Sequence, residues 1–543
     1  MNAPLAPLSH HPAPGTAPRV AWLDEVLQDK WHPGFSALES DAQEPFIRQC
    51  DPLPMEPIKP VSDTQWLAVS TKACELLGVN ANSITADPAW LAVMSGNAAP
   101  AHFQPYAAVY AGHQFGVFVP RLGDGRALNL GALNGWEMQL KGAGPTPYAR
   151  FADGRAVLRS SIREFLCSEA MHALGIPTTR ALSLTISSLP VMRETLETAA
   201  VVCRVAPSFV RFGTFEYFAS RGRVDLLEVL VNHVNELLWI ATPPSAARND
   251  GIGNRTRNDM SVTARAPKEP VAAHALQLLH EVSHRTARLM AQWMGAGFMH
   301  GVMNTDNFSI LGLTLDYGPF GFMDAFEANH ICNHSDYSGR YAYAAQPQVG
   351  LWNVAKLINA LHPLVPDTEQ LQAVVETYKT TYAASMQEIL RKKFGLQALD
   401  DETYTSVTDD FYTLLQSQHI DYTLAFRALA NANDQAFLDL CVDREAAKPW
   451  LARYRQAAQH AAQAQGISQA SRAAAMNKVN PKFVLRNWVA EEVIRAVRDD
   501  ANTKPFEEVF TVLQSPFDEH PEFSRYAQTP PDWASHLEVS CSS

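Results

Sequence analysis

Two aspartates and an asparagine near the middle of the chain have the residue types and spacing of a metal site. The run Asn304-Thr305-Asp306-Asn307 is followed by Asp316-Tyr317-Gly318, with Asp316 ten residues after Asp306. Carboxylate and amide oxygens suit Mg²⁺, which keeps several waters and bridges to substrate phosphates. We therefore expect a nucleotide and metal site on two short paired strands. The alternative is a turn whose Asn and Asp side chains bind only local amides.

A lysine and a glutamate further upstream fit the same chemistry. Lys141 ends the strand-like run 137–140, and Glu164 follows 23 residues later on a helix that apolar spacing predicts over 156–174. Protein kinases hold ATP phosphates with such a Lys–Glu ion pair, and bind metal with an Asn and the Asp of a DFG triplet. Asp316-Tyr317-Gly318 has the shape of that triplet.

Arginines and glycines gather around Lys141. The guanidinium group can bind phosphate oxygens in pairs, although a solvated basic face would have the same composition. The turns 122–126 and 152–155 are expected to offer backbone amides to an anion. No GxxxxGK[ST] loop occurs, which argues against a P-loop nucleotidase. The arginines are Arg126, Arg150, Arg155, Arg159, Arg163, Arg204 and Arg211.

A competing hypothesis comes from His280-Glu281-Val282-Ser283-His284, which matches the HExxH pattern of zinc hydrolases. Two histidines one helical turn apart could bind zinc while the glutamate activates water. The usual third ligand is missing, because no Glu occurs between Arg285 and Phe326. His300 or Asp306 could still complete such a site, so a zinc hydrolase remains an alternative.

Composition limits the class of protein. The 543 residues carry 44 Lys and Arg against 56 Asp and Glu, a net charge of −12, which disfavours general binding of nucleic acid or anionic membranes. Charged residues interrupt every apolar segment, and the first twenty residues lack the pattern of a secretion signal. Seven scattered cysteines form no CxxC pair. We expect a cytoplasmic protein.

The order of elements predicts an α+β chain with a bilobal, protein-kinase-like fold, because a small β-rich part with one helix precedes a large helical part. A polar stretch between Pro243 and Pro270 is expected to be a loop. The expected units are 1–20, a disordered arm; 21–105, a helical and extended segment; 106–215, a β-rich nucleotide-binding lobe; 216–430, a mostly helical lobe with the catalytic Asp and the metal site; and 431–543, a helical extension with a cysteine-containing tail.

Several long segments resemble the selenoprotein O family, also called YdiU, from about residue 60 to the end. They are YAGHQFGVFVPRLGDGRALNLG, LKGAGPTPYARFADGRAVLRSSIREFL, VVCRVAPSFVRFGTFEYF, HGVMNTDNFSILGLTLDYGPFGFMD, NPKFVLRNWVAEEVI and the terminal CSS. The resemblance implies a pseudokinase-like protein that binds ATP in a flipped orientation. It further implies transfer of AMP from ATP, with Mg²⁺ or Mn²⁺, to Ser, Thr or Tyr hydroxyls of proteins. UMP transfer from UTP is also ascribed to the family.

The resemblance also implies roles for individual residues. Asp306 is similar to the catalytic base, and Asn307 and Asp316 to the metal ligands. Glu164 matches the helix partner of Lys141. The positions that match nucleotide contacts are Gly123, Gly125, Arg126, Lys141, Asp153, Gly154, Arg204 and Arg211.

Three alternatives to AMP transfer stay open at this stage: a kinase-type phosphotransferase, a zinc hydrolase and an inactive nucleotide-binding module. Cys541 stands where eukaryotic members carry selenocysteine. A regulatory disulfide between Cys332 and Cys541 is a further hypothesis, with two independent thiols as its alternative.

Overall fold

The computed structural model describes residues 19–20, 61, 63–100, 105–241, 271–431 and 434–539. Of the predicted arm, only Arg19–Val20 falls within these ranges, as strand β1, which pairs in parallel with β3 (Ala99–Pro100). The predicted loop between Pro243 and Pro270 lies outside the described residues. Within the described ranges, every helix is too short or too polar to cross a lipid bilayer.

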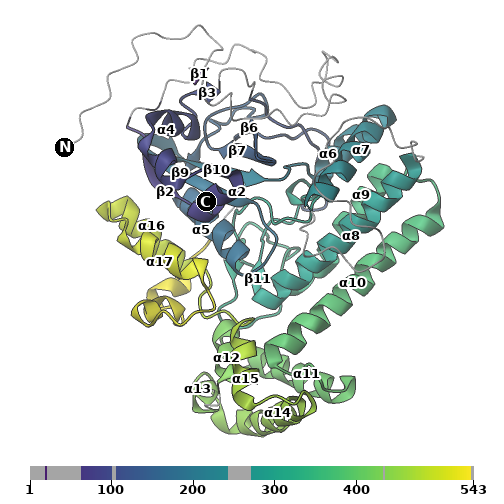
Figure 1. Ribbon diagram of the computed structural model, residues 1–543, viewed down its shortest axis with the longest axis vertical. Coiled ribbons are helices and arrows are strands. Elements are labelled where there is room, and N and C mark those ends of the chain that lie inside the picture. Colours follow the sequence, from purple (N-terminus) through teal and green to yellow (C-terminus); the bar gives the residue numbers. More distant parts are fainter. Residues whose placement is uncertain are drawn as a thin grey trace.

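An antiparallel sheet of six strands forms the upper part of the molecule in Figure 1. Its strand order is β2-β9-β10-β7-β6, with β8 beside β10. Side chains alternate between the two faces of each strand. Met138 and Leu140 therefore face one way, while Gln139 and Lys141 face the other. The strands are β2 (Gln65–Val69), β6 (Ala127–Leu133), β7 (Trp136–Lys141), β8 (Ala156–Val157), β9 (Arg180–Met192) and β10 (Leu196–Ala206).

Helices cover both faces of this sheet. The apolar face that includes Met138 and Leu140 packs against three short helices: α2 (Thr71–Leu77), α3 (Ala81–Ala86) and α4 (Pro88–Met94). The opposite face meets α5 (Leu158–Ala173), as the spacing of apolar residues predicted. Nearly the whole of α5 is buried, including Arg163 and Glu164. Charged residues buried on this side require partners, which the site provides.

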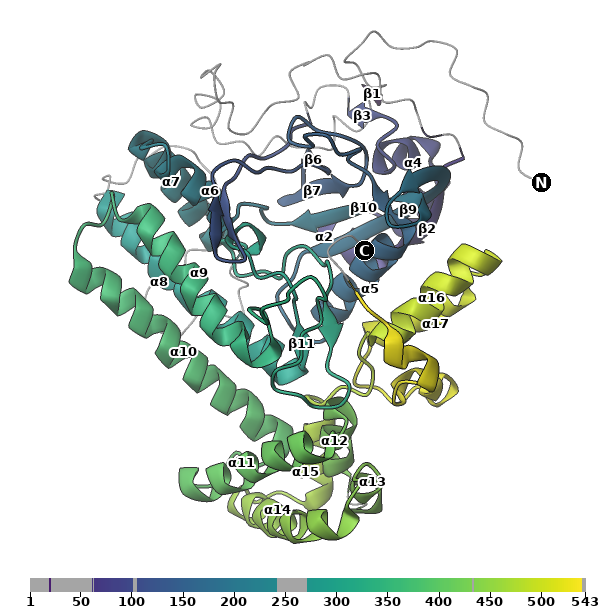
Figure 2. The ribbon, with the colours of Figure 1, turned by 180° about the vertical axis from the view of Figure 1, so that it is seen from behind.

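Long helices form the rest of the molecule. In both ribbon views α8, α9 and α10 run side by side, and α11 to α15 form a lower bundle around a separate apolar core (Figures 1 and 2). The helices of the first group are α6 (Phe212–Ala219), α7 (Val224–Ala241), α8 (Val271–Ala296), α9 (Gln346–Leu361) and α10 (Thr368–Phe394). The bundle contains α11 (Asp401–Gln418), α12 (Tyr422–Ala430), α13 (Asp434–Leu438), α14 (Arg444–Ala464) and α15 (Gln469–Asn477).

The last two helices return to the sheet. Helices α16 (Asn487–Asp500) and α17 (Lys504–Gln514) lie against α5, on the side of the molecule opposite α10 (Figure 2). The ring of Phe165 on α5 lies 5.2 Å from that of Phe510. Arg163 donates to the Asn487 side chain at 3.1 Å. The C-terminal helices therefore support the helix that carries Glu164.

The segment around Asp306 and Asp316 differs from our prediction of two paired strands. Asp306 lies in a single 3-10 turn, Thr305–Asn307, and Asp316 lies outside any strand with a φ of 61°. A left-handed backbone at a residue other than glycine interrupts strand geometry, so no regular hairpin can form through Asp316. Two short strands, β11 (Phe298–Met299) and β12 (Gly321–Phe322), pair outside this segment.

Lys393, at the end of α10, yields a prediction about pH. Its ammonium lies in the lower core, 4.2 Å from the ring centre of Phe426, and burial lowers its pKa from 10.5 to about 7. The unfolded chain therefore binds more protons than the folded chain between pH 7 and 10.5, and stability rises with pH in that window. We expect Lys393→Met to raise the free energy of unfolding by at least about 1 kcal/mol at pH 7 and by less at pH 10.

Urea denaturation at the two pH values measures this effect. Lys392→Met is the matched control, because Lys392 is exposed and pairs with Glu388 at 2.5 Å, and it should change stability by less than about 1 kcal/mol at either pH. A Lys393→Met protein less stable than the parent at pH 7 would contradict the prediction.

Candidate active site

The polar face of the sheet and α5 together hold an ion-pair network. Gln139 on β7 lies opposite Arg204 on β10, and Lys141 shares their face. The Lys141 ammonium lies 2.7 Å from one carboxylate oxygen of Glu164, and an Arg204 nitrogen lies 3.2 Å from the other. The Lys–Glu ion pair that the 23-residue spacing predicted is therefore present, and Arg204 joins it.

Asp316 brings three cations together. Its carboxylate lies 2.6 Å from Arg211 and 3.3 Å from Lys141, and it also accepts from Arg204. Burial raises the pKa of Asp316, but Arg211, Arg204 and Lys141 outweigh that effect and hold the pKa well below its usual value. Asp316 is thus a fixed anion that links the sheet to the segment after α8.

A third carboxylate completes the group. Asp124, in the turn before β6, lies 3.5 Å from Arg211, and Gln139 donates to it at 3.4 Å. Three cations therefore face three carboxylates, and the group has no surplus positive charge for phosphates. We call the set the charge cluster; its members are Asp124, Lys141, Glu164, Arg204, Arg211 and Asp316.

Asp306 lies beside the charge cluster with one oxygen unused. Its backbone carbonyl accepts from Arg211 at 2.7 Å, and its Oδ2 accepts from Gln114 at 3.2 Å. Its Oδ1 is buried and makes no hydrogen bond to any described residue. Burial raises the pKa of Asp306 to about 6, against the opposing effect of Arg211. A buried carboxylate oxygen without a partner is costly, which is typical of a group that acts on a ligand.

The hairpin of β4 (Gly112–Gln114) and β5 (Val117–Val119) holds the segment that contains Asp306. Three successive hairpin residues each contact one residue of that segment. The His113 amide donates to Thr305 at 2.7 Å, Gln114 donates to Asp306, and the Phe115 amide donates to Asn304 at 3.1 Å. The hairpin is therefore the element that aims the Asp306 carboxylate.

Close contacts require glycine at two positions, one in this hairpin and one in α6. A Cβ atom at Gly112 would lie 2.4 Å from Oδ1 of Asp306, and one at Gly213 would lie 2.1 Å from the carbonyl oxygen of Ala111. A side chain at position 112 would therefore displace the carboxylate. These two glycines therefore allow the hairpin, α6 and the segment that contains Asp306 to pack closely together.

A second polar group lies behind the hairpin. Glu216 on α6 accepts from the Thr305 hydroxyl and lies 2.5 Å from Nδ1 of His113. Burial raises the pKa of Glu216 to about 7, although the Thr305 hydrogen bond acts against it. Burial also lowers the pKa of His113 to about 4, helped by the charges of Lys356 and Arg340. The neutral imidazole can then donate from Nδ1 to Glu216.

The oxygen atoms near Asp306 fit a hard divalent cation. Asn307 donates through Nδ2 to the Val302 carbonyl at 3.0 Å, which leaves its Oδ1 as the atom for a ligand. Asp316 supplies a carboxylate that remains ionised. Oxygen donors of this kind suit Mg²⁺ or Mn²⁺. Because the charge cluster is balanced, polyphosphate would need the additional positive charge of such an ion.

Comparison with known proteins identifies the family. The family model described as protein adenylyltransferase SelO matches residues 55–514. The chain belongs to this family. Curated relatives of the chain, including the following three, carry the name protein nucleotidyltransferase YdiU. The Bordetella petrii protein is 47% identical over 494 residues, which cover 89% of this chain and 94% of that protein. The Burkholderia multivorans protein is 46% identical over 518 residues (90% and 92%), and the Albidiferax ferrireducens protein 47% over 494 (89% and 93%).

The expected SelO nucleotide positions divide into two groups. Lys141, Arg204 and Arg211 belong to the charge cluster, and Gly123 and Gly125 flank its member Asp124. Arg126 is exposed and directly precedes β6. Asp153 and Gly154 lie elsewhere, in the turn before β8. The Asp153 carboxylate forms a two-pronged ion pair with Arg193 at 2.8 Å, which the sequence did not reveal.

The two glycine turns are less open to anions than we expected. The amides of Asp124 and Gly125 donate to the carbonyls of Ala108 and Gly123, at 2.9 and 2.8 Å. In the other turn, the Arg155 amide donates to the Asp153 carboxylate at 2.9 Å. These amides are used within the protein, so the prediction of two anion nests was wrong for them. The glycines instead permit close packing, because a Cβ atom at Gly123 would strike the Tyr148 ring.

The HExxH pattern does not form a metal site in the described part of the SelO chain. His280 binds Thr377 at 2.9 Å and Glu281 pairs with Arg285 at 2.7 Å. Within the described ranges, no three His, Cys, Asp or Glu side chains gather where they could hold a metal ion. The residues of this pattern instead link α8 to α10 and to the next turn of α8.

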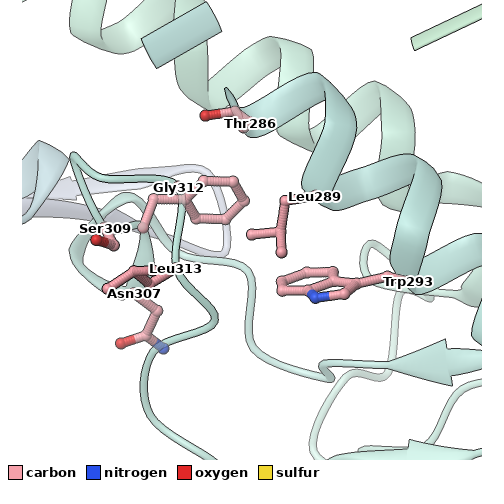
Figure 3. A pocket seen from close by; sticks show the side chains of 8 residues that line it. Thr286, Leu289, Trp293, Asn307, Ser309, Gly312 and Leu313 are labelled. Carbon is pink, nitrogen blue, oxygen red and sulfur yellow. The ribbon is translucent and has the colours of Figure 1, made fainter. Parts of the chain in front are cut away.

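A small recess between α8 and the segment after Asp306 is a different feature. Leu289 and Trp293 line it from α8, and Gly312 and Leu313 face them (Figure 3). The side chain of Asn307 points away from these apolar groups (Figure 3). The recess has no charged lining residue, so it does not suit nucleotide phosphates.

Cys332 is buried, and its thiol contacts the Pro319 carbonyl at 3.0 Å. Cys541 lies outside the described residues, so the proposed Cys332–Cys541 disulfide stays a prediction.

Replacement of an arginine in a buried ion pair should lower the stability of this chain more than replacement of an arginine in an exposed ion pair. Removal of one member of a buried ion pair leaves an unpaired charge and costs about 3–5 kcal/mol, whereas an exposed pair contributes at most about 1 kcal/mol. We therefore expect Arg204→Met to lower the free energy of unfolding by about 3–5 kcal/mol. Arg193→Met, which removes the partner of the exposed Asp153, should cost less than about 1 kcal/mol.

Urea denaturation provides the measurement, from the unfolding transition of the part of the protein that contains the sheet. Equal losses for the two variants would show that the charge cluster does not depend on Arg204.

Proposed function

We propose that the chain transfers AMP from ATP to Ser, Thr or Tyr hydroxyls of proteins, with Mg²⁺ or Mn²⁺. One observation carries the proposal: a buried carboxylate with a free oxygen, Asp306, lies beside a group of cations that already binds a fixed anion, Asp316. The family description, protein adenylyltransferase, supports the choice of AMP as the transferred group. The name of the relatives, protein nucleotidyltransferase, supports protein as the acceptor. UTP is a second candidate donor.

We propose a bilobal, kinase-like arrangement for this activity. The β-rich lobe would correspond to 106–215, the helical lobe to 216–430 and the helical extension to 431–543. The Lys141–Glu164 pair on the sheet and α5, together with Asp316 after α8, supports this reading, because kinases combine the same three groups. Return of α16 and α17 to α5 distinguishes this chain from a simple two-lobe enzyme.

In the proposed reaction, the acceptor hydroxyl attacks the α-phosphorus of ATP. A bond forms between the hydroxyl oxygen and that phosphorus, and the bond to the bridging oxygen breaks, so pyrophosphate leaves. Asp306 accepts the hydroxyl proton through Oδ1, the atom without a partner. Its raised pKa, about 6, is suited to proton transfer near neutral pH.

Other residues would bind and orient the phosphates. Lys141, Arg204 and Arg211 would stabilise the negative charge that leaves with pyrophosphate. Asn307 and Asp316 would hold the divalent ion, which neutralises phosphate charge when bound. Gly123, Gly125, Arg126, Asp153 and Gly154 remain proposed nucleotide contacts on the basis of family resemblance.

Incubation with ATP labelled at either the α or the γ phosphorus tests the proposal. We expect α label, but no γ label, on proteins of a cell extract, with release of pyrophosphate. Asp306→Ala should reduce labelling at least about 100-fold with little effect on ATP affinity, because a general base contributes about 10²–10⁴-fold to the rate. Asp316→Ala should weaken binding of ATP with Mg²⁺. Transfer of γ label alone would instead identify a kinase.

Gln114 gives a second test, because its side-chain amide donates to the Asp306 carboxylate. Replacement by leucine removes that hydrogen bond and leaves the carboxylate free to rotate. We expect Gln114→Leu to lower kcat for AMP transfer at least about tenfold with KM for ATP changed less than about twofold, since a lost hydrogen bond to a charged group is worth about 1.5–3 kcal/mol. Gln114→Asn retains a donor on a shorter side chain and should recover part of kcat. A rise in KM alone would contradict a role in aiming Asp306.

A further inference from the structure

Five side chains next to the proposed base form a basic and apolar surface. His113 and Phe118 come from the β4–β5 hairpin, Arg340 precedes α9, and Trp352 and Lys356 lie on α9. Two cationic groups lie over the same aromatic ring. The guanidinium of Arg340 and the ammonium of Lys356 each lie 4.6 Å from the ring centre of Trp352. The His113 ring lies 5.3 Å from Trp352 and 5.0 Å from Phe118. We call these five residues the basic patch.

The basic patch adjoins Asp306 on two sides. Gln114, the residue after His113, donates to the Asp306 carboxylate. Tyr341, the residue after Arg340, donates to Asn304 at 2.7 Å. Two members of the patch, His113 and Arg340, are therefore chain neighbours of residues that hydrogen-bond to the segment of the proposed base.

The two cations of the basic patch lack carboxylate partners. Surface cations of the helical part usually face one, as Lys379 faces Glu376 at 2.8 Å. Within the described part of the chain, neither Arg340 nor Lys356 makes an ion pair, and Nε of Arg340 is buried without a hydrogen bond. Glu216, behind His113, already binds His113 and Thr305. The patch thus carries two positive charges that form no ion pair with a described residue, in a chain of net charge −12.

Apolar side chains border these charges. Val117 at the end of the hairpin is 68% exposed, and Phe118 is 37% exposed. Exposed apolar groups next to unpaired charges are typical of a surface that binds another protein. The cations stacked on Trp352 are held in place, which lowers the entropic cost of binding an anion.

We propose that the basic patch binds acidic side chains that flank the acceptor hydroxyl of a protein substrate. This proposal rests on the proposed AMP transfer and adds a preference in the substrate: Asp or Glu close to the modified Ser, Thr or Tyr. We infer an acidic partner because the positive charges of Arg340 and Lys356 would attract carboxylates. The proposed site for the nucleotide phosphates and their divalent ion is at the charge cluster, which shares no residue with the basic patch, so the patch is available to the second substrate.

Binding of short peptides to the full-length protein tests the proposal without requiring transfer. The probes are three fluorescein-labelled 13-residue peptides, identical except that the serine at the centre is flanked by Glu, Gln or Lys. We expect fluorescence anisotropy at 50 mM NaCl to show at least about tenfold tighter binding of the Glu peptide than of the Lys peptide. The difference should fall at 500 mM NaCl, because salt screens exposed charges.

Variants of the patch locate the binding site. Lys356→Gln should weaken binding of the Glu peptide about threefold, and Lys356→Glu about tenfold or more, with ATP affinity unchanged. Arg340→Gln provides an independent second variant, and melting temperature checks that each variant is folded. Lys478→Glu is the matched control, because Lys478 is exposed at the end of α15 and makes no ion pair with a described residue. It should bind the peptides like the parent protein.

Three results would overturn the proposal: equal binding of the three peptides, a preference for Glu that survives in both Lys356 variants and in Arg340→Gln, or a loss of ATP affinity in these variants. Transfer of α label to the same peptides and to extract proteins is measured in parallel. Absence of α label on every protein would refute AMP transfer, whereas the anisotropy result would still decide whether the patch recognises acidic peptides.

Discussion

The arrangement of the site depends on the attraction between Asp316 and the cations Lys141, Arg204 and Arg211. A buried carboxylate at this depth is tolerated only with such partners, and the cations equally need the carboxylate. Because the cations come from the sheet and from the segment before α6, while Asp316 follows α8, these ion pairs connect the two halves of the chain. The divalent ion and the phosphates of the proposed reaction would enter a site whose charges already balance.

Regular elements near the site were predictable from the sequence because their signals are local. The period of two along β7 places Lys141 on a polar face, and the apolar spacing of α5 places Glu164 opposite it. The same period would have placed Gln139, two residues before Lys141, on the same face of the sheet. The segment around Asp316 could not be predicted in this way, since its left-handed backbone depends on contacts with distant residues. Family resemblance, which compares whole segments, supplied the role of Asp306.

The features that the sequence did not reveal are contacts between irregular segments. Asp153 pairs with Arg193, 40 residues away, and Gln114 contacts Asp306, 192 residues away. Neither pair lies in a repeating pattern, so no local periodicity indicates it. The prediction that the turn amides bind anions was wrong for the same reason. The acceptor of the Asp124 amide, for example, is the Ala108 carbonyl, which comes from another part of the fold and is not indicated by the local sequence. Residue type suggested the chemistry, and tertiary contacts decided which groups remain available.

Packing of α16 and α17 against α5 has a consequence for synthesis. Helix α5 ends at residue 173, but Phe506 and Phe510, which contact Phe165, belong to α17, which is synthesised much later than α5. During translation the helix that carries Glu164 therefore lacks part of its apolar surroundings until α17 has emerged from the ribosome. Nascent chains would thus acquire the full set of contacts around Phe165 only after α17 has been made, which couples maturation of the site to a distant segment of the chain.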